Sequence, residues 1–195
     1  MSQVLPIREA AGFRRGFVDN ASFGMALFVF TEVMLFAGFI SAFVIVHSGS
    51  RTAWPPPGQP RLPAEQTAIN TLALLASGVC LHFAGKKFRG ARPRAAAPWM
   101  GAALALAAFF VIFQGMEWVA LLRQGMTLTS SQLGSFFYVI VGAHALHAVA
   151  AMIALAVSWV MLQAGRLTRS QLGAVQLFWY FVVLVWPFLY WKVYL

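Results

Sequence analysis

The sequence predicts an all-α integral membrane protein, a bundle of five transmembrane helices. Of the 195 residues, 61% are hydrophobic and only 10% are charged, whereas about a quarter of the residues of a soluble domain are charged. The chain contains five apolar runs, each close to the roughly 20 residues that a spanning helix needs. Polar, basic or proline-rich segments separate the runs. We therefore expect a single membrane domain over residues 1–195.

The basic character of the chain indicates its membrane topology. The net charge is +9; basic chains can attract nucleic acid, but Lys and Arg of membrane proteins gather in cytoplasmic loops. Three Lys or Arg precede the first run, five lie between the second and third runs, and two lie between the fourth and fifth. On the opposite side, two lie between the first and second runs, one lies between the third and fourth, and one lies near the end of the fifth. We expect a cytoplasmic N-terminus, a C-terminus outside (periplasmic), and no nucleic-acid partner.

The first span is predicted over residues 22–46. Asp19, Asn20 and Ser22 are of the types that cap helix N-termini, and the apolar run follows them directly. The loop over 54–63 contains five prolines. Because proline lacks the backbone N–H that a helix interior requires, this loop separates the first span from the second.

The remaining spans are predicted over residues 67–84, 98–122, 133–162 and 172–195. The second ends at Gly85, and a strongly basic loop over 86–94 leads to the third. The last contains Pro187, which favours a kink. It ends in Trp and Tyr residues, which are typical of the membrane interface.

Glu32 is a carboxylate in the middle of the first span. At about 1.5 Å per residue it lies roughly 15 Å deep, near the centre of a hydrocarbon core about 30 Å thick. Acidic groups at that depth are costly and normally face a protein or water-filled interior. His144 and His147 share one face of the fourth span at i, i+3, and His147 reaches a similar depth. We predict that Glu32 approaches this histidine face, as a structural hydrogen bond, a lipid contact or a proton relay.

Other polar residues of the spans have simpler interpretations. Gln114 and Glu117 are spaced i, i+3 near the end of the third span, where Glu117 is expected at the interface with water or lipid headgroups. Asn70 and Thr71 are expected to hydrogen-bond between helices. His47 is expected in a solvated loop.

The residues themselves predict no catalytic or metal-binding site. Cys80 is the only cysteine, which excludes an internal disulfide and a CxxC motif and gives copper no second sulfur ligand. The two histidines of the fourth span could support at most one haem. Three hypotheses stay open at this point: an accessory subunit of a membrane complex, a stand-alone proton or solute transporter, and a membrane cytochrome b.

Four segments, taken in order, resemble subunit III of the haem–copper respiratory oxidases. They are Phe30–Phe43 with Thr31-Glu32, Trp54-Pro-Pro, Asn70–Val79, and Phe136-Phe137 with Gly142–His147, followed by Trp179–Tyr190. Together they cover nearly the whole chain from Ser22 onward, and their common order is more specific than any one segment. The chain is similar to the five-helix bacterial form of this family; longer members have two further helices on the N-terminal side.

The resemblance implies an accessory subunit of a terminal oxidase, either a cytochrome c or a quinol oxidase, which couples oxygen reduction in aerobic respiration to proton translocation. Such a subunit packs on catalytic subunit I, together with subunit II, in the bacterial inner membrane. It binds phospholipid and supports proton uptake by the oxidase and the durability of the catalytic centre. Haem and copper are bound by its partner subunits. The positions that match the family's intramembrane polar and lipid-contacting residues are Glu32, Trp54, Asn70, Glu117, His144 and His147.

The chain departs from the family pattern near the end of the bundle. Many members have His and Asp in the last helix where this chain has Tyr180 and Val183. Many also have an arginine, aimed at a lipid phosphate, close to the position of Met161, where the nearest cation here is Arg166. We expect lipid contacts at this end to differ from those of the family.

Overall fold

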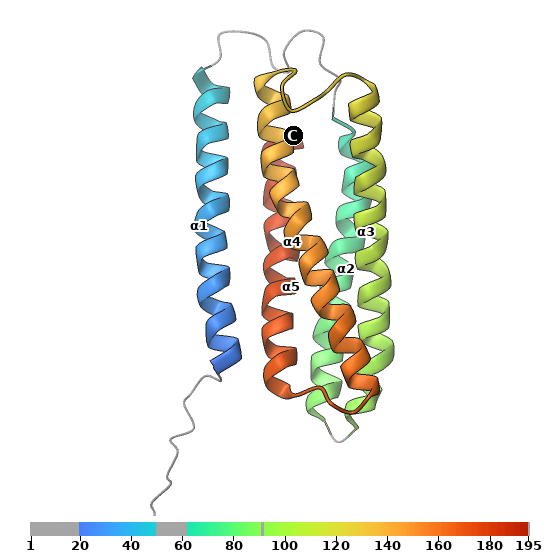
Figure 1. Ribbon diagram of the computed structural model, residues 1–195. Helices are drawn as coiled ribbons and strands as arrows, with labels where there is room; N and C mark the ends of the chain where they lie inside the picture. Colours follow the sequence, from blue (N-terminus) through green and yellow to red (C-terminus); the bar gives the residue numbers. More distant parts are fainter. Residues whose placement is uncertain (1–19, 50–61, 91, 195) are drawn as a thin grey trace, which may run out of the picture.

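A computed structural model describes residues 20–49, 62–90 and 92–194 of the chain. Within these ranges the structure contains five long helices and no strand, and all five are long and apolar enough to cross a membrane. They are α1 (Asn20–Gly49), α2 (Ala64–Arg89), α3 (Ala97–Arg123), α4 (Gln132–Gln163) and α5 (Arg169–Leu189), with a 3-10 turn, η1 (Pro93–Ala96), before α3 and a π-helical turn, η2 (Tyr190–Tyr194), after α5 (Figure 1). The predicted all-α five-helix membrane bundle is confirmed.

Local sequence signals account for the turns at both ends of α4. The Ser131 hydroxyl accepts a hydrogen bond from the Gly134 N–H and caps its first turn, as short polar side chains do at helix N-termini. Gly165 has a φ of +70° just after the helix, and the N–H of Arg166 bonds the carbonyl of Met161. This left-handed C-terminal turn favours a residue without a Cβ. Thr168 then starts α5 with a capping box.

Helices α2, α3, α4 and α5 form the body of the bundle, and α1 lies along one side of it against α5 and α4 (Figure 1). In the most apolar stretch of α1 only 11% of the residues are buried, against 50% in α5. The buried residues of α1 are Phe36 and Phe43. Helix α1 therefore meets the body along one narrow line, and Glu32 lies one turn before Phe36 on that line.

The interface between α2 and α5 combines small residues with large aromatic side chains. The indole N–H of Trp179 donates to the Ser77 hydroxyl at 3.1 Å, and that of Trp186 donates to the Thr71 hydroxyl at 2.9 Å. The side chain of Val183 packs close to Gly78, where an added Cβ would lie 3.2 Å from it. Small residues let membrane helices approach closely, and Gly78 has this role at the α2–α5 interface.

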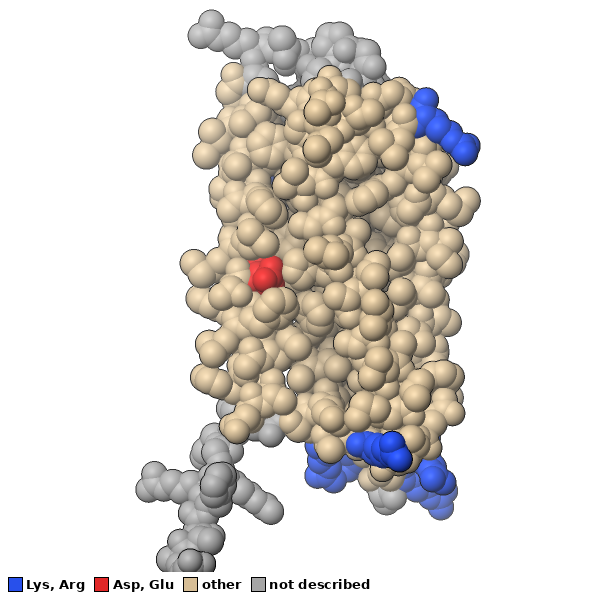
Figure 2. Space-filling model, viewed as in Figure 1, with Lys and Arg blue, Asp and Glu red and all other residues tan. Residues whose placement is uncertain are grey.

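Basic residues lie at the two ends of the bundle in the view of Figure 2, and large hydrophobic side chains such as Phe30, Met34 and Ile45 are exposed between the ends. Among the described residues, the end that holds the α2–α3 and α4–α5 turns contains Lys86, Lys87, Arg89, Arg92, Arg94, Arg166 and Arg169. The opposite end contains Arg123 and Lys192. In this view one acidic group lies on the flank, between the two charged ends (Figure 2).

Candidate functional site

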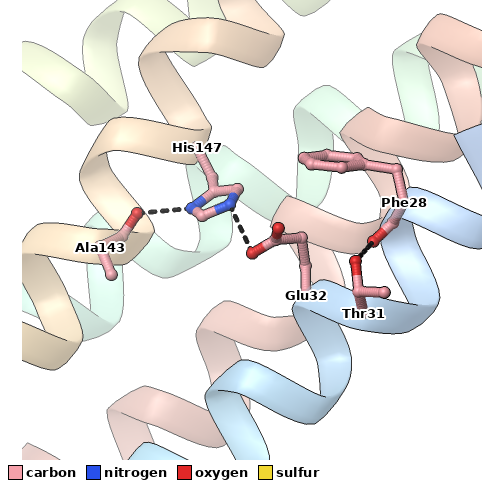
Figure 3. Close-up of polar contacts among 5 residues, drawn as sticks. All are labelled: Phe28, Thr31, Glu32, Ala143 and His147. Carbon is pink, nitrogen blue, oxygen red and sulfur yellow. Dashed lines mark hydrogen bonds and ion pairs between the residues drawn. The ribbon is translucent and has the colours of Figure 1, made fainter.

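Glu32 and His147 form a direct contact between α1 and α4 (Figure 3). The Oε2 atom of Glu32 lies 3.0 Å from Nε2 of His147. The other ring nitrogen, Nδ1, lies 2.7 Å from the carbonyl oxygen of Ala143, one turn earlier in α4. The prediction that Glu32 faces the bundle and approaches the histidines of the fourth span is confirmed for His147.

The second histidine contact determines where the protons of this pair lie. A carbonyl oxygen only accepts hydrogen bonds, so Nδ1 of His147 carries a proton and donates it to Ala143. The contact between Nε2 and Glu32 then needs one further proton. That proton is shared by an imidazolium and a carboxylate, or by a neutral imidazole and a carboxylic acid. In both forms the pair holds one proton between α1 and α4.

Aromatic rings pack around the Glu32–His147 pair and leave both side chains largely buried. The ring of His147 lies 5.6 Å from that of Phe36, 5.9 Å from Phe181 and 6.3 Å from Phe178, measured between centroids. The side chains of His147 and Glu32 are 13% and 17% exposed. A polar contact in such an apolar environment is electrostatically stronger than in water, and Nε2 of His147 has Glu32 as its described partner.

His144 lies three residues earlier on α4 and, apart from Phe36, has different neighbours from His147. It is 1% exposed, and its ring stacks on Trp186 with a centroid distance of 4.8 Å. The ring of Phe36 lies 6.3 Å away and that of Phe110 6.2 Å away. Phe36 of α1 thus contacts both histidines, but the contact with Glu32 involves His147 alone, because His144 packs against Phe110 of α3 and Trp186 of α5.

A second buried polar group, the Glu117 cluster, lies near one end of the bundle. Its members are Thr67, Asn70, Gln114, Glu117 and Tyr194. The hydroxyl of Thr67 lies 3.0 Å from both carboxyl oxygens of Glu117. The amide nitrogen of Gln114 donates to Glu117 at 2.8 Å and to the hydroxyl of Tyr194 at 3.0 Å. The cluster joins α2 and α3 to η2.

The prediction that Glu117 lies at the interface with water or headgroups is wrong. Glu117 is only 6% exposed and Gln114 only 4%. Glu117 lies near the end of α3, as its place in the sequence predicts, but its carboxyl group points inward and bonds Thr67 on α2 and Gln114 on α3. Sequence reasoning did not assign Thr67 or Tyr194 to a site: the Thr67 hydroxyl bonds Glu117, and the hydroxyl of Tyr194 accepts from Gln114. The i, i+3 spacing of Gln114 and Glu117 was the one available signal.

The remaining predictions for polar residues have mixed outcomes. Asn70 donates to the carbonyl of Phe110 at 3.2 Å and Thr71 accepts from Trp186, so their predicted interhelical hydrogen bonding is confirmed. His47 lies in the last turn of α1 and stacks on Phe43, so its prediction as a loop residue is wrong. Trp54 lies outside the described residues. Across residues 20–49, 62–90 and 92–194, no three His, Cys, Asp or Glu side chains gather as a metal site would require.

An apolar groove runs between α1 and α5 beside the Glu32–His147 pair. Its volume is about 400 Å³. Val33, Phe36 and Ile40 line it from α1, and Tyr180, Leu184 and Phe188 are among the residues that line it from α5. Phe36 both borders the groove and contacts the ring of His147. The groove and the polar pair therefore share one wall.

Comparison with known proteins identifies the family of the chain. Residues 9–195 match the model of the family described as cytochrome c oxidase subunit III. The chain is 32% identical over 191 residues to cytochrome c oxidase subunit 3 of Synechocystis sp., covering 96% of this chain and 80% of the relative. It is 34% identical to that of Pelomedusa subrufa (90% and 69% covered) and 29% identical to a probable cytochrome c oxidase subunit 3 of Nocardia farcinica (90% and 88% covered). The chain belongs to the cytochrome c oxidase subunit III family.

Proposed function

We propose that this chain is the accessory, non-redox subunit of a haem–copper terminal oxidase, which couples oxygen reduction in aerobic respiration to proton translocation. The observation that carries the proposal is the match to the subunit III family over residues 9–195. That match includes all five helices, which supports one subunit III-like membrane domain over the whole chain. The transporter and cytochrome b alternatives find no support in the comparisons.

The proposal assigns the redox centres to partner subunits. Catalytic subunit I and subunit II would hold haem and copper, and this chain would pack on subunit I. The broad apolar surface of α1, with Phe30, Met34 and Ile45 each more than 60% exposed, provides area for contact with a partner helix or with lipid. Electrons would pass through the partner subunits alone.

The groove between α1 and α5 is proposed as a phospholipid site. Its lining is almost entirely apolar, and its volume of about 400 Å³ suits much of a single acyl chain. Lipid there would cover the exposed edge of Glu32 and His147. The lipid would hold α1 against α5, and the polar pair would hold α1 against α4. Together they would maintain the contact surface on which proton uptake and durability of the catalytic subunit depend.

The basic end of the bundle is proposed to face the cytoplasm. Among described residues seven Lys or Arg lie at that end and two at the other, the asymmetry that the positive-inside rule describes. With five helices the termini then lie on opposite sides, the N-terminus in the cytoplasm and the C-terminus outside. We propose the bacterial inner membrane as its location.

Purification of the native complex tests the proposal directly. An affinity tag on this chain should retain subunits I and II with their haem and copper, in fixed ratio to this chain. The isolated chain should show no Soret band. Recovery of the chain alone from gently solubilised membranes, or haem bound to the chain by itself, would contradict the proposal.

A further inference from the structure

A second groove, the α3–α4 groove, lies at the end of the bundle that holds the α2–α3 and α4–α5 turns. Its volume is about 410 Å³. The lining combines a cation and an amide with apolar side chains, and its main residues are Arg94, Pro98, Gly101, Trp159, Leu162 and Gln163. None of these residues lines the groove between α1 and α5. The molecule therefore has a separate groove with one charged border.

The indole ring of Trp159 forms one wall of the α3–α4 groove. Its N–H donates to the carbonyl of Ala97, the first residue of α3, at 3.1 Å. The ring lies beside Gly101, where an added Cβ would be 3.7 Å from the indole nitrogen. Because glycine has no side chain, space is left between the ring and α3. Tryptophan is typical of the depth at which lipid headgroups meet the hydrocarbon core, so this wall lies where the upper part of an acyl chain passes.

The charged border of the groove has no acidic neighbour among the described residues. The described carboxylates are Glu32, Glu65 and Glu117. Glu32 contacts His147, whereas Glu65 begins α2 and Glu117 lies near the end of α3, both toward the opposite end of the bundle. Seven described Lys or Arg lie at the end that holds the groove. Arginine binds phosphate through two N–H groups at once, so the charge around Arg94 complements an anionic headgroup.

We propose that the α3–α4 groove binds an anionic phospholipid, with the phosphate at Arg94 and one acyl chain between Gly101 and Trp159. Gly101 follows Arg94 by seven residues, which places it roughly 10 Å deeper at about 1.5 Å per residue. The lining thus changes from charged to apolar in the same direction as a phospholipid does. The proposal requires only that the bundle spans a membrane, and it is independent of the assignment to an oxidase.

The combination of charge and apolar surface favours a lipid over other anions. A free phosphate ion would contact the cation alone, and an acidic protein segment would leave the apolar wall uncovered. The groove between α1 and α5 offers a contrast, because no charged side chain lines it. Selection by headgroup charge is therefore expected in the α3–α4 groove and not in the other.

Cross-linking with a photoreactive lipid tests the proposal at the groove itself. The chain, purified with all subunits that accompany it, is placed in phosphatidylcholine vesicles that contain a small share of phosphatidylglycerol with a photoreactive acyl chain. Mass spectrometry of peptides gives the yield of cross-links on residues 98–101 and 159–162. This yield should be several-fold higher than with phosphatidylcholine that carries the same photoreactive chain. Arg94→Ala should lower it about fivefold, the effect of one cation at an anionic membrane surface.

Two further variants separate a site from general attraction to the basic end. The matched control is Arg89→Ala, which removes an exposed cation at the same end but outside the groove lining, and it should leave the yield unchanged. Gly101→Leu fills the space beside Trp159 and should lower the yield although Arg94 remains. Equal losses in Arg94→Ala and Arg89→Ala, equal yields from the two lipids, or loss of the cross-links on addition of inorganic phosphate would each overturn the proposal. If Gly101→Leu does not assemble, the two arginine variants decide alone.

Discussion

Glu32 and His147 each depend on the other for a hydrogen bond in an apolar part of the bundle. Nδ1 of His147 is occupied by the carbonyl of Ala143, so Glu32 is the one described partner of Nε2. The two residues lie 115 positions apart in the chain, and their contact is a polar link between α1 and α4. At the scale of single residues, the pair links α1 to α4 through one hydrogen bond in which the two side chains share a proton.

Replacement of Glu32 by glutamine should preserve this link. The amide group that Glu32→Gln introduces can donate to Nε2 of neutral His147, so assembly and initial oxidase turnover should stay within about twofold of wild type, a change of less than about 1 kcal/mol. The measurement is turnover of the purified complex at matched subunit content. Immediate loss of electron transfer in this variant would contradict an accessory role.

Replacement of Glu32 by leucine should weaken the link. Glu32→Leu leaves Nε2 of His147 without a partner, which costs roughly 1–3 kcal/mol when a buried polar group is left unsatisfied. Because His147 is 13% exposed, we expect the lower part of that range. The measurement is the midpoint temperature at which the chain dissociates from the complex, and a midpoint equal to that of Glu32→Gln would contradict the prediction.

Glu117 should contribute more to stability than its position near a helix end suggests. Glu117→Leu would leave one amide proton of Gln114 without its acceptor, at a cost of roughly 1–3 kcal/mol for a buried group left unsatisfied, while the Thr67 hydroxyl keeps the carbonyl of Pro63 as its acceptor. The thermal midpoint of the purified protein should fall clearly. The matched control is Glu65→Leu, since Glu65 is exposed in the first turn of α2 and its loss should leave the midpoint unchanged.

At the scale of helices, the interface between α2 and α5 depends on close approach. The amide of Gln176 occupies the space next to Gly85 where a side chain would begin, and it donates to the carbonyl of Leu81 at 3.0 Å. Gly85 therefore has a packing role in addition to its place near the end of the predicted span. By contrast, a Cβ added at Gly38 on α1 would meet no atom within 4 Å.

These two glycines provide a matched pair of substitutions. Gly85→Ala should displace Gln176 and cost about 1–3 kcal/mol, as overpacking of a close contact typically does. Gly38→Ala faces open space and should leave stability unchanged or slightly raised, because alanine favours helix by about 1 kcal/mol relative to glycine. Thermal midpoints of both variants in the same detergent check the prediction, and equal losses would argue against the close packing at Gly85.

At the scale of the whole molecule, more of the described basic residues lie at one end of the bundle than at the other, and one acidic group lies on the flank between the ends in the view of Figure 2. Helix α1 contributes most of its surface to the outside of the chain and little to the core. The exposed apolar surface of α1 is suited to contact with lipid or with a larger helical partner. Removal of this subunit should leave an oxidase that turns over but loses activity faster, as measured by the half-life of turnover with and without the chain.

Site-directed labelling should reveal the orientation of the bundle. With Cys80 replaced by serine, the only cysteine is removed and new ones can be placed in exposed turns. Thr129→Cys, in the turn between α3 and α4, should react with a membrane-impermeant maleimide in intact cells. Arg92→Cys, before η1, should react only after permeabilisation, and the opposite pattern would reverse the proposed topology.

The sequence by itself determined the number, type and approximate bounds of the helices. The length and hydrophobicity of each apolar run, and the turn residues at its ends, determine a helix locally. They can therefore be read without knowing which helices pack beside it. The i, i+3 histidines and the depth of Glu32 were equally readable, and they were enough to predict the contact with His147. Depth along a helix follows from counting residues at a constant rise.

Only the tertiary structure decided which way the polar side chains face and what they meet. In a membrane the apolar residues lie on every side of a helix, and the pattern that separates buried from exposed faces in soluble proteins is weak. His144 and His147 consequently reach different neighbours, and Glu117 is buried where an interfacial position was predicted. Its partner Gln114 bonds Tyr194, 80 residues away, and such a contact exists only once α5 and η2 have packed against α2 and α3.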